Sequence, residues 1–415
     1  MGARVRSIGV DAELPAFLHP FASPSRPSFI SIARGEGAVL WDRDGNEYLD
    51  AMASLWYCAA GHGRTEIADA VHEQLATLEA YSCFEPFTNG PADELAERVR
   101  ALTPIDSARV FLCESGSEAV DTAMKLARLT HALDGHPERT LIISRERGYH
   151  GVNFGGTSAQ GIAPNRSGWG PLVPEVVQAP SEDIEALSLL MAERSDQVAA
   201  VLVEPVQGAG GVYPPPPGYL EDLRRLCDRH GALLIFDEVI TGFGRLGTWF
   251  AAEHYGVTPD LTTFAKAVTS GYQPLGGVVV GPRVRAALES DPKYLLRHGY
   301  TYSGHPAACA AALTNLAIME REGLLEQAAT LGARLGDGLQ ALAADDVIDH
   351  ARGDVAVWAA GLRPDQDAIS ARDAMLARGV ITRAVGTDTL TFCPPFVTTD
   401  GQVDRIVDTL SSSLR

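Results

Sequence analysis

The chain has few lysines and no concentration of positive charge. Only Lys125, Lys266 and Lys293 occur among its 415 residues, so that arginine supplies nearly all of its positive charge. Acidic residues are in excess, with 53 Asp and Glu against 34 Lys and Arg and a formal net charge of −19. A strongly acidic chain without clustered basic runs repels phosphate backbones and anionic lipid surfaces. We therefore expect neither nucleic acid nor a membrane among its partners.

Long apolar stretches and closely spaced cysteines are also missing. Residues 1–20 mix Arg, Asp, Glu and Pro and lack the apolar core of a signal peptide, and no later stretch is long and apolar enough to span a bilayer. The six cysteines lie far apart without a C-x-x-C pair, which argues against a metal site and against a disulfide framework. These absences predict a cytoplasmic protein with reduced thiols.

The middle of the chain alternates short apolar runs with amphipathic stretches between residues 108 and 281. This alternation predicts an α/β fold with a mainly parallel sheet and helices on both faces. In such folds, ligands bind at the carboxyl ends of the strands. Helices are expected at Ser117–Arg128 and Gly218–Arg229. The expected strands are Ala108–Leu112, Thr140–Ser144, Ala199–Glu204, Leu233–Val239, Leu261–Phe264 and Gly277–Val280.

The two ends of the chain differ in character from this middle part. After Gly304 we expect a long Ala-rich helix at Pro306–Arg321, then a second helix and short strands at Ile381–Ala384 and Thr389–Phe392. Near the start, Val39–Leu49 has the pattern of a hairpin with an Asp-Gly-Asn turn. Since the length exceeds the roughly 100–200 residues of one domain, we predict three parts: an N-terminal segment that packs with the small domain, a large ligand-binding domain, and a C-terminal small domain, at residues 1–55, 56–300 and 301–415.

Two charged features follow neighbouring expected strands. Asp237 and Glu238 end one strand, and Lys266 follows the next. Taken alone, an Asp-Glu pair is more often a helix cap, and a single lysine is more often a surface residue. Together they are what a pyridoxal cofactor needs, because the amine can bond to the cofactor's aldehyde and a carboxylate can keep its pyridine nitrogen protonated.

Two further features have the same relation to strands. Ser115-Gly116-Ser117 opens an expected helix, where free backbone N–H groups bind phosphate and glycine allows a close approach. Tyr149-His150-Gly151 follows another strand, and an aromatic ring there can lie over a flat heterocycle. Each has a simpler interpretation, as a helix cap or as a half-buried ring. Their occurrence in order with Asp237 and Lys266 favours one cofactor site.

One motif points to a different cofactor. Gly242–Gly247 matches the G-x-G-x-x-G fingerprint of dinucleotide-binding folds and follows a strand. That fingerprint opens a helix and is followed about 20 residues later by an acidic residue that binds ribose. Ala267 occupies that place, and a dinucleotide would leave Asp237 and Glu238 unexplained. We therefore reject this interpretation.

The residues from Phe236 to Arg245, FDEVITGFGR, followed by Pro259-Asp260 and Lys266, resemble the signature of the class III (ω) aminotransferases. The resemblance covers nearly the whole chain and is highly specific. It implies a pyridoxal phosphate-dependent enzyme of fold type I, with a mostly parallel central sheet in the large domain and a smaller α+β domain built from both termini. It also implies a homodimer with shared active sites. Further matching segments are Ser115–Ala119, Tyr149–Gly151, Glu204–Gln207 and Thr301–Pro306.

The resemblance also implies roles for single residues. Lys266 would hold the cofactor covalently and Asp237 would pair with its pyridine nitrogen, which makes these two the catalytic residues. Val239 and Tyr149 would enclose the ring, and Thr301 of the other subunit would reach the phosphate. The implied binding set for pyridoxal 5′-phosphate is Ser115, Gly116, Ser117, Tyr149, His150, Glu204, Asp237, Val239, Lys266 and Thr301.

The implied substrate-binding residues are Trp56, Tyr149 and Arg383. Trp56, in the segment MASLWY, resembles the substrate-lining tryptophan of ω-transaminases that use pyruvate, although a core tryptophan is the alternative. The segment Ile381–Arg383, followed by Pro394-Pro395, resembles the family segment whose mobile arginine clamps a substrate carboxylate. A guanidinium suits that role because it can bind both oxygens. In the ornithine and 4-aminobutyrate branches, a glutamate five residues after the Glu-Pro glutamate pairs with that arginine. Here that position is Ala209.

This combination favours a transaminase that takes an amine or a β- or ω-amino acid as donor and pyruvate as acceptor, by a ping-pong mechanism. A diaminononanoate-forming transaminase stays open, because such enzymes can also carry a small residue at this position. A racemase, an aminomutase or a decarboxylase on the same scaffold stays open as well, since its cofactor residues would be identical. A non-catalytic protein of this fold is disfavoured by the presence of both Lys266 and Asp237.

Overall fold

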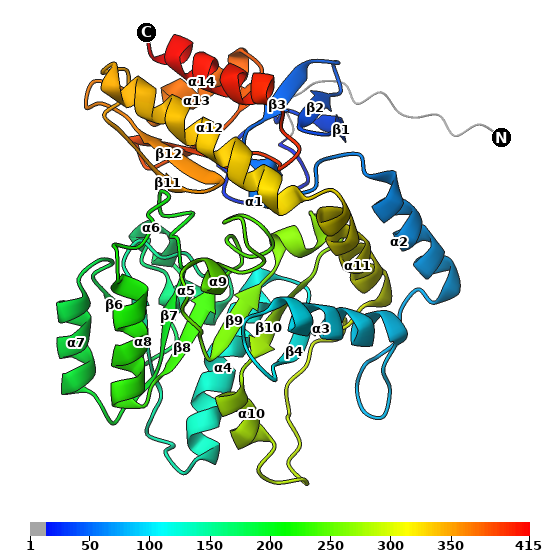
Figure 1. Cartoon of the computed structure of the whole chain (residues 1–415), viewed down its shortest axis with the longest axis vertical. Coiled ribbons are helices and arrows are strands. Elements are labelled where there is room, and N and C mark those ends of the chain that lie inside the picture. The colour runs from blue at the N-terminus through cyan, green and yellow to red at the C-terminus, as the bar shows by residue number, and fades with distance from the viewer. Residues whose placement is uncertain (1–13) are drawn as a thin grey trace.

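The computed structural model describes residues 14–415 (Figure 1). Its large central sheet has seven strands in the order β4-β10-β9-β8-β7-β5-β6. Only β10 runs antiparallel to its neighbours, so the prediction of a mainly parallel sheet is confirmed. The strands are β4 (Arg109–Cys113), β5 (Leu141–Arg145), β6 (Val176–Ala179), β7 (Val198–Val203), β8 (Leu233–Asp237), β9 (Leu261–Phe264) and β10 (Gly276–Val280).

Strand β6 is the one that the sequence pattern did not predict. It is four residues long, lies at the edge of the sheet and is only partly buried over most of its length. Strands β7 and β8, in contrast, are buried at every residue. A strand that is covered on both faces reads as a continuous apolar run, whereas a short edge strand leaves no such pattern.

Helices cover both faces of the central sheet. Helix α8 (Tyr219–His230) shows why these segments are helical: it has acidic residues in its first turn, basic residues in its last, and left-handed glycines at both caps. Helix α4 (Gly116–Leu133) extends beyond the predicted Ser117–Arg128. The other helices of this part are α3 (Gly90–Leu102), α5 (Phe154–Ala159), α6 (Ala163–Arg166), α7 (Ile184–Glu193), α9 (Ala251–His254) and α10 (Pro282–Leu288).

The beginning and the end of the chain fold together. The predicted hairpin forms from β2 (Val39–Asp42) and β3 (Glu47–Asp50), and β3 pairs in parallel with β13 (Val380–Ile381). Strand β1 (Ile32–Glu36) completes this sheet. A second sheet has the order β11-β12-β15-β14, with strands His350–Asp354, Val357–Gly361, Thr389–Phe392 and Arg383–Val385. The smaller α+β part is therefore built from both termini, while the division at residues 55/56 and 300/301 stays a prediction.

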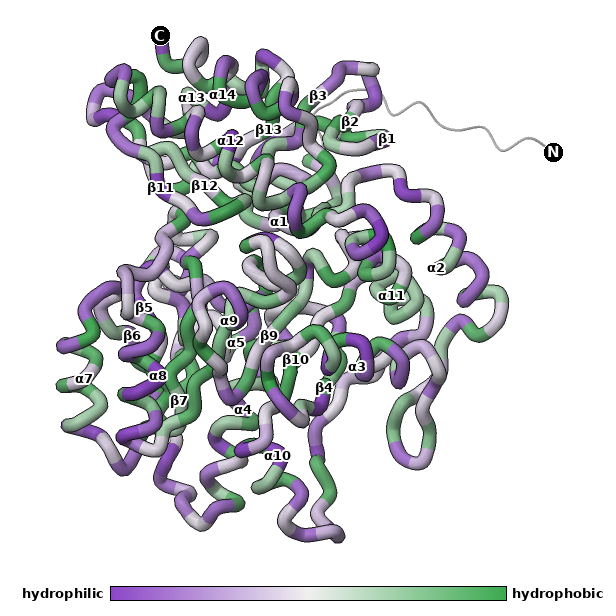
Figure 2. The backbone as a smooth tube through the Cα atoms, viewed as in Figure 1, coloured by the Kyte–Doolittle hydropathy of each residue, from purple (hydrophilic) through white to green (hydrophobic). Residues whose placement is uncertain are grey.

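Helices α12 (Leu324–Ala344), α13 (Ala368–Ala377) and α14 (Asp400–Leu414) pack beside these two small sheets (Figure 1). Helix α11 (Pro306–Arg321), at its predicted position, contacts α2 (Thr65–Thr77), α3 and the short 3-10 helix η1 (Lys266–Thr269). Helix α1 (Ala53–Trp56) follows β3 directly. Figure 2 shows apolar segments along the central strands and hydrophilic segments on the outer helices, as expected for helices with one buried face.

Three further observations concern the described residues. Among residues 14–415, no helix has the length and apolar character needed to cross a bilayer. The same residues contain no group of three or more His, Cys, Asp or Glu side chains arranged to hold a metal ion. All six cysteines are free thiols, and all but Cys83 are buried.

Candidate active site

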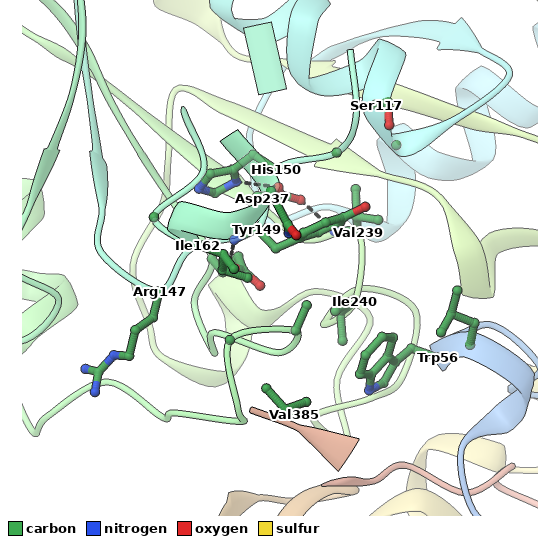
Figure 3. A pocket seen from close by; sticks show the side chains of 18 of the residues that line it. Trp56, Ser117, Arg147, Tyr149, His150, Ile162, Asp237, Val239, Ile240 and Val385 are labelled. Carbon is green, nitrogen blue, oxygen red and sulfur yellow. Dashed lines mark hydrogen bonds and ion pairs between the residues drawn. The ribbon is translucent and has the colours of Figure 1, made fainter. Parts of the chain in front are cut away.

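A cavity of about 600 Å³ lies at the carboxyl ends of the central strands (Figure 3). Its wall is formed by loops that follow β4, β5, β7, β8 and β9, and by residues of α1 and β14. It therefore brings together segments from the whole length of the chain. The predicted site residues in its wall are Trp56, Gly116, Ser117, Tyr149, His150, Glu204, Asp237, Val239, Lys266 and Arg383.

The carboxylate of Asp237, at the end of β8, is fixed by three hydrogen bonds. Thr263 Oγ1 and the backbone N–H of Val239 donate to Oδ1 at 3.1 and 3.2 Å, and His150 Nδ1 lies 2.8 Å from Oδ2 (Figure 3). Asp237 and His150 are both buried. A buried carboxylate held from several sides has one orientation, which suits it to face a positively charged group in the cavity.

Glu204 holds the backbone that carries Tyr149. Its carboxylate accepts hydrogen bonds from the N–H groups of Tyr149 and Gly208, at 2.8 and 2.9 Å. Burial raises the pKa of this carboxyl above its usual range. The sequence predicts Glu204 as a cofactor-binding residue, and the structure shows through which contacts it acts on the site: it fixes the loop of Tyr149.

Lys266 places an amine in the cavity. It follows β9 and begins η1 with a positive φ of 49°. Within residues 14–415 its Nζ forms no hydrogen bond or ion pair, and it lies 5.9 Å from the centroid of the Trp56 ring. Loss of hydration lowers the pKa of the amine. An amine of this kind is available as a nucleophile and as a base.

The start of α4 forms the third side of the cavity. Its N–H groups and the positive end of its dipole favour a bound anion. A Cβ on Gly116 would lie 2.8 Å from the nearest side-chain carbon of Val239, so that glycine allows this close packing. Ser117 Oγ lies in the cavity wall and accepts a hydrogen bond from Val152 N at 3.1 Å.

Two predicted residues do not line the cavity. Ser115 Oγ accepts a hydrogen bond from Glu118 N at 3.2 Å, and thus caps α4. Thr301 lies in a second, smaller hollow of about 270 Å³ with Tyr81, Phe84 and Tyr302. Within a single chain, Thr301 therefore does not reach the cavity. The sequence resemblance implies that Thr301 acts in the site of another subunit.

Trp56 fits both interpretations that the sequence allows. Its ring is 3% exposed and packs with Met52 and Ile240, yet it also forms part of the cavity wall. Arg383 Cζ lies 5.3 Å from the ring centroid, in the range of a cation–π contact. Burial lowers the pKa of Arg383. Ala209 lines the same cavity as Arg383.

Sequence reasoning missed several lining residues. Arg147 lies two positions before Tyr149, and its guanidinium carbon lies 4.0 Å from the ring of Tyr213. Its closeness to the Tyr-His-Gly motif could have identified it. Phe21 and Asn165 also line the cavity, but they belong to segments without a periodic pattern. The rejected glycine motif forms a series of turns and opens no helix at Gly242–Gly247.

The residues present fit pyridoxal 5′-phosphate. The cavity offers an amine, an oriented carboxylate, an aromatic ring and a helix start, the groups that bind its aldehyde, ring nitrogen, ring face and phosphate. Gly116 also packs closely against Val239, so that the start of α4 lies beside the part of the cavity wall that Val239 forms.

Comparisons with known proteins find aminotransferases. The family described as "Aminotransferase class-III" matches residues 21–414. The chain is 40% identical to the beta-alanine–pyruvate aminotransferase of Pseudomonas aeruginosa, over 92% of this chain and 91% of that protein. It is 39% identical to an omega-aminotransferase of Caulobacter vibrioides, over 96% and 97% of the two chains. An amine transaminase structure from an uncultivated Pseudomonas species, solved in its PLP-bound form, superposes with a TM-score of 0.92 at 35% identity, covering 97% of this chain and 99% of that chain.

Proposed function

The chain belongs to the class III aminotransferases, and we propose that it moves the amino group of an amine, or of a β- or ω-amino acid, to pyruvate. Its cofactor is pyridoxal 5′-phosphate. The main support for these substrates is the set of residues around Arg383. Among residues 14–415, this guanidinium forms no ion pair, and the position from which related branches supply a glutamate is Ala209.

The proposed catalytic roles follow from charge and position. When bound, the cofactor supplies an aldehyde that bonds to the substrate amine and a ring that takes up electrons as the substrate C–H bond breaks. Asp237, oriented by His150 and Thr263, keeps the ring nitrogen protonated. The lowered pKa of Lys266 leaves its Nζ more readily uncharged. Nζ can then take the proton from the donor carbon that bears the amine and deliver it to the cofactor carbon.

The same cavity serves both substrates in turn, which is the basis of the proposed ping-pong mechanism. A donor without an α-carboxylate needs no cation beside the reacting carbon, and Arg383 can stay against Trp56. Pyruvate brings a carboxylate, which the guanidinium can bind through both oxygens. A glutamate at position 209 would compete for that guanidinium. Alanine leaves it available to the acceptor.

We also propose that the enzyme works as a homodimer. Thr301 is surrounded by exposed aromatic side chains, with Tyr81, Phe84 and Tyr302 between 54% and 61% exposed. Exposed apolar groups that gather in one place mark interaction sites. A second copy of the chain would cover this surface, and its Thr301 would complete the phosphate site at the start of α4.

The proposal is tested by the visible spectrum of the purified holoenzyme. One donor at a time, such as β-alanine or an uncharged primary amine, is added without keto acid, and then pyruvate or 2-oxoglutarate is added. Loss of the cofactor's yellow band with a donor, followed by recovery with pyruvate, supports the proposal. Recovery with 2-oxoglutarate alone would contradict the acceptor. A band that no donor removes would favour the racemase, aminomutase or decarboxylase alternative.

A further inference from the structure

The backbone of Lys266 is held in an unusual conformation. Lys266, the first residue of the short η1 helix, and Ser270, which directly follows it, have φ values of 49° and 48°. Residues other than glycine rarely adopt this left-handed conformation, and they keep it only where the surrounding structure enforces it. The contacts that enforce it therefore determine where the Lys266 amine lies.

A single buried side chain makes three hydrogen bonds to this turn. Asn315, on α11, has no exposed surface. Its amide nitrogen donates to the carbonyl oxygens of Ala267 and Val268, at 2.9 and 3.0 Å. Its amide oxygen accepts a hydrogen bond from Ser270 Oγ at 2.8 Å. The amide nitrogen and the amide oxygen thus both bond to the turn that begins with Lys266.

Ser270 extends this network to another wall of the cavity. Its hydroxyl oxygen also accepts a hydrogen bond from the backbone N–H of Ala60, at 2.9 Å. Ala60 lies four residues after Trp56, in the same N-terminal segment. Asn315 and Ser270 therefore connect the turn of Lys266 to the segment that carries the tryptophan of the substrate pocket.

The packing of α11 alone does not call for a polar residue at this position. Every other buried residue of α11 is apolar, including Ala311, Ala312 and Leu316. A buried amide is costly unless its hydrogen bonds are made. Here the partners are the backbone carbonyls of η1 and the Ser270 hydroxyl, together with a longer contact to Met319 Sδ at 3.5 Å.

We propose that Asn315 is a positioning residue, which fixes the backbone of the η1 turn and thereby the place of the Lys266 amine at the reacting atoms. Asn315 does not line the cavity and touches no reacting group itself. Its effect passes through the main chain of the two residues that follow Lys266. The inference rests on the catalytic role proposed for Lys266.

The test uses the holoenzyme of Asn315→Ala beside the wild type and a matched control, His131→Ala. His131 is also buried and bonds a backbone carbonyl, Ala199 O at 2.9 Å, but near the amino end of β7, away from the cavity. Three quantities are measured: cofactor content, the pH midpoint of the bound cofactor's absorption change without substrate, and kcat and KM for one donor.

For Asn315→Ala we expect full cofactor content, an absorption midpoint displaced by roughly half a pH unit or more, and a kcat lowered about 10- to 100-fold. The KM should change much less. His131→Ala should lower the melting temperature without moving the midpoint. A wild-type midpoint together with a wild-type kcat in Asn315→Ala would overturn the proposal, as would equal effects in the control.

A second variant keeps the test decisive if Asn315→Ala does not fold. Ser270→Ala removes the hydroxyl between Asn315 and Ala60 and is expected to move the midpoint in the same direction by a smaller amount. No displacement in Ser270→Ala would then overturn the proposal. Because the absorption midpoint is measured without donor or acceptor, its result is independent of whether the proposed substrates are correct.

Discussion

Replacing Arg383 by methionine is expected to separate the use of pyruvate from the use of uncharged substrates. The guanidinium lies in the cavity wall, 5.3 Å from the ring of Trp56. Burial lowers its pKa, but an arginine remains protonated in a protein. Methionine fills a similar volume and keeps an apolar contact with the ring, so that the main loss is the positive charge.

The size of the effect follows from the hydrogen bonds that the charge can make. A hydrogen bond to a charged group contributes about 1.5–3 kcal/mol, and a two-oxygen contact with a carboxylate lies toward the upper end. A loss of about 3 kcal/mol corresponds to roughly a 100-fold lower affinity. For pyruvate, kcat/KM should fall by this factor. For an aldehyde of similar size without a carboxylate, it should change by less than about threefold.

The measurement starts from enzyme that has been treated with donor and freed from product, and follows the recovery of the visible band with pyruvate or with the aldehyde. Arg372→Met is the control, because it removes the same charge from α13, where Arg372 pairs with its neighbour Asp373. If Arg383→Met slows pyruvate and the aldehyde equally, or slows neither, Arg383 does not bind the acceptor carboxylate.

Two other substitutions test the site, and a third tests how a buried carboxyl affects stability. Lys266→Ala should abolish turnover while circular dichroism and gel filtration stay as in the wild type, and an active variant would contradict the assignment of the catalytic lysine. Ala209→Glu should raise the KM for pyruvate about tenfold, since a carboxylate in the same wall would pair with Arg383; an unchanged KM would show that the two side chains do not meet. Burial raises the pKa of Glu238 from 4.5 to about 7. Between these pH values the folded chain keeps a proton that the unfolded chain has released. The free energy of unfolding should therefore fall by roughly 3 kcal/mol as pH rises from below the lower value to above the higher one. In Glu238→Gln, urea denaturation at pH 5 and pH 8 should show that this fall is absent.

The sequence indicates most of the site because the chemistry lies at the ends of buried strands. Asp237 and Lys266 directly follow or end apolar runs that become β8 and β9, and neighbouring parallel strands bring such positions to one edge of the sheet. The same argument places Gly116 after β4 and Tyr149 after β5. Local pattern and fold topology are enough for these residues.

Residues that act through distant contacts escape this reasoning. Asn315 occupies a buried position of an Ala-rich helix and, in sequence, lies 48 residues from Ala267, to which it donates. The apolar period of the helix marks it only as a core position. Thr301 shows another limit: within one chain it lies away from the cavity, and its predicted role rests on the proposed second copy. Local sequence patterns indicate neither contacts between residues far apart in the chain nor the assembly of chains.

The cavity wall contains a second strained segment, and it is held in the same way as Lys266. Ala53, Ser54 and Trp56 all have positive φ values, between 44° and 62°. The buried carboxylate of Asp50 accepts hydrogen bonds from Met52 N at 3.0 Å and Ser54 N at 2.6 Å. Strain of this kind is maintained by the surrounding fold. The two walls that face a substrate thus depend on two buried polar side chains, Asp50 and Asn315, that do not line the cavity. Substitutions at these two supports should therefore lower catalysis although neither residue lines the cavity.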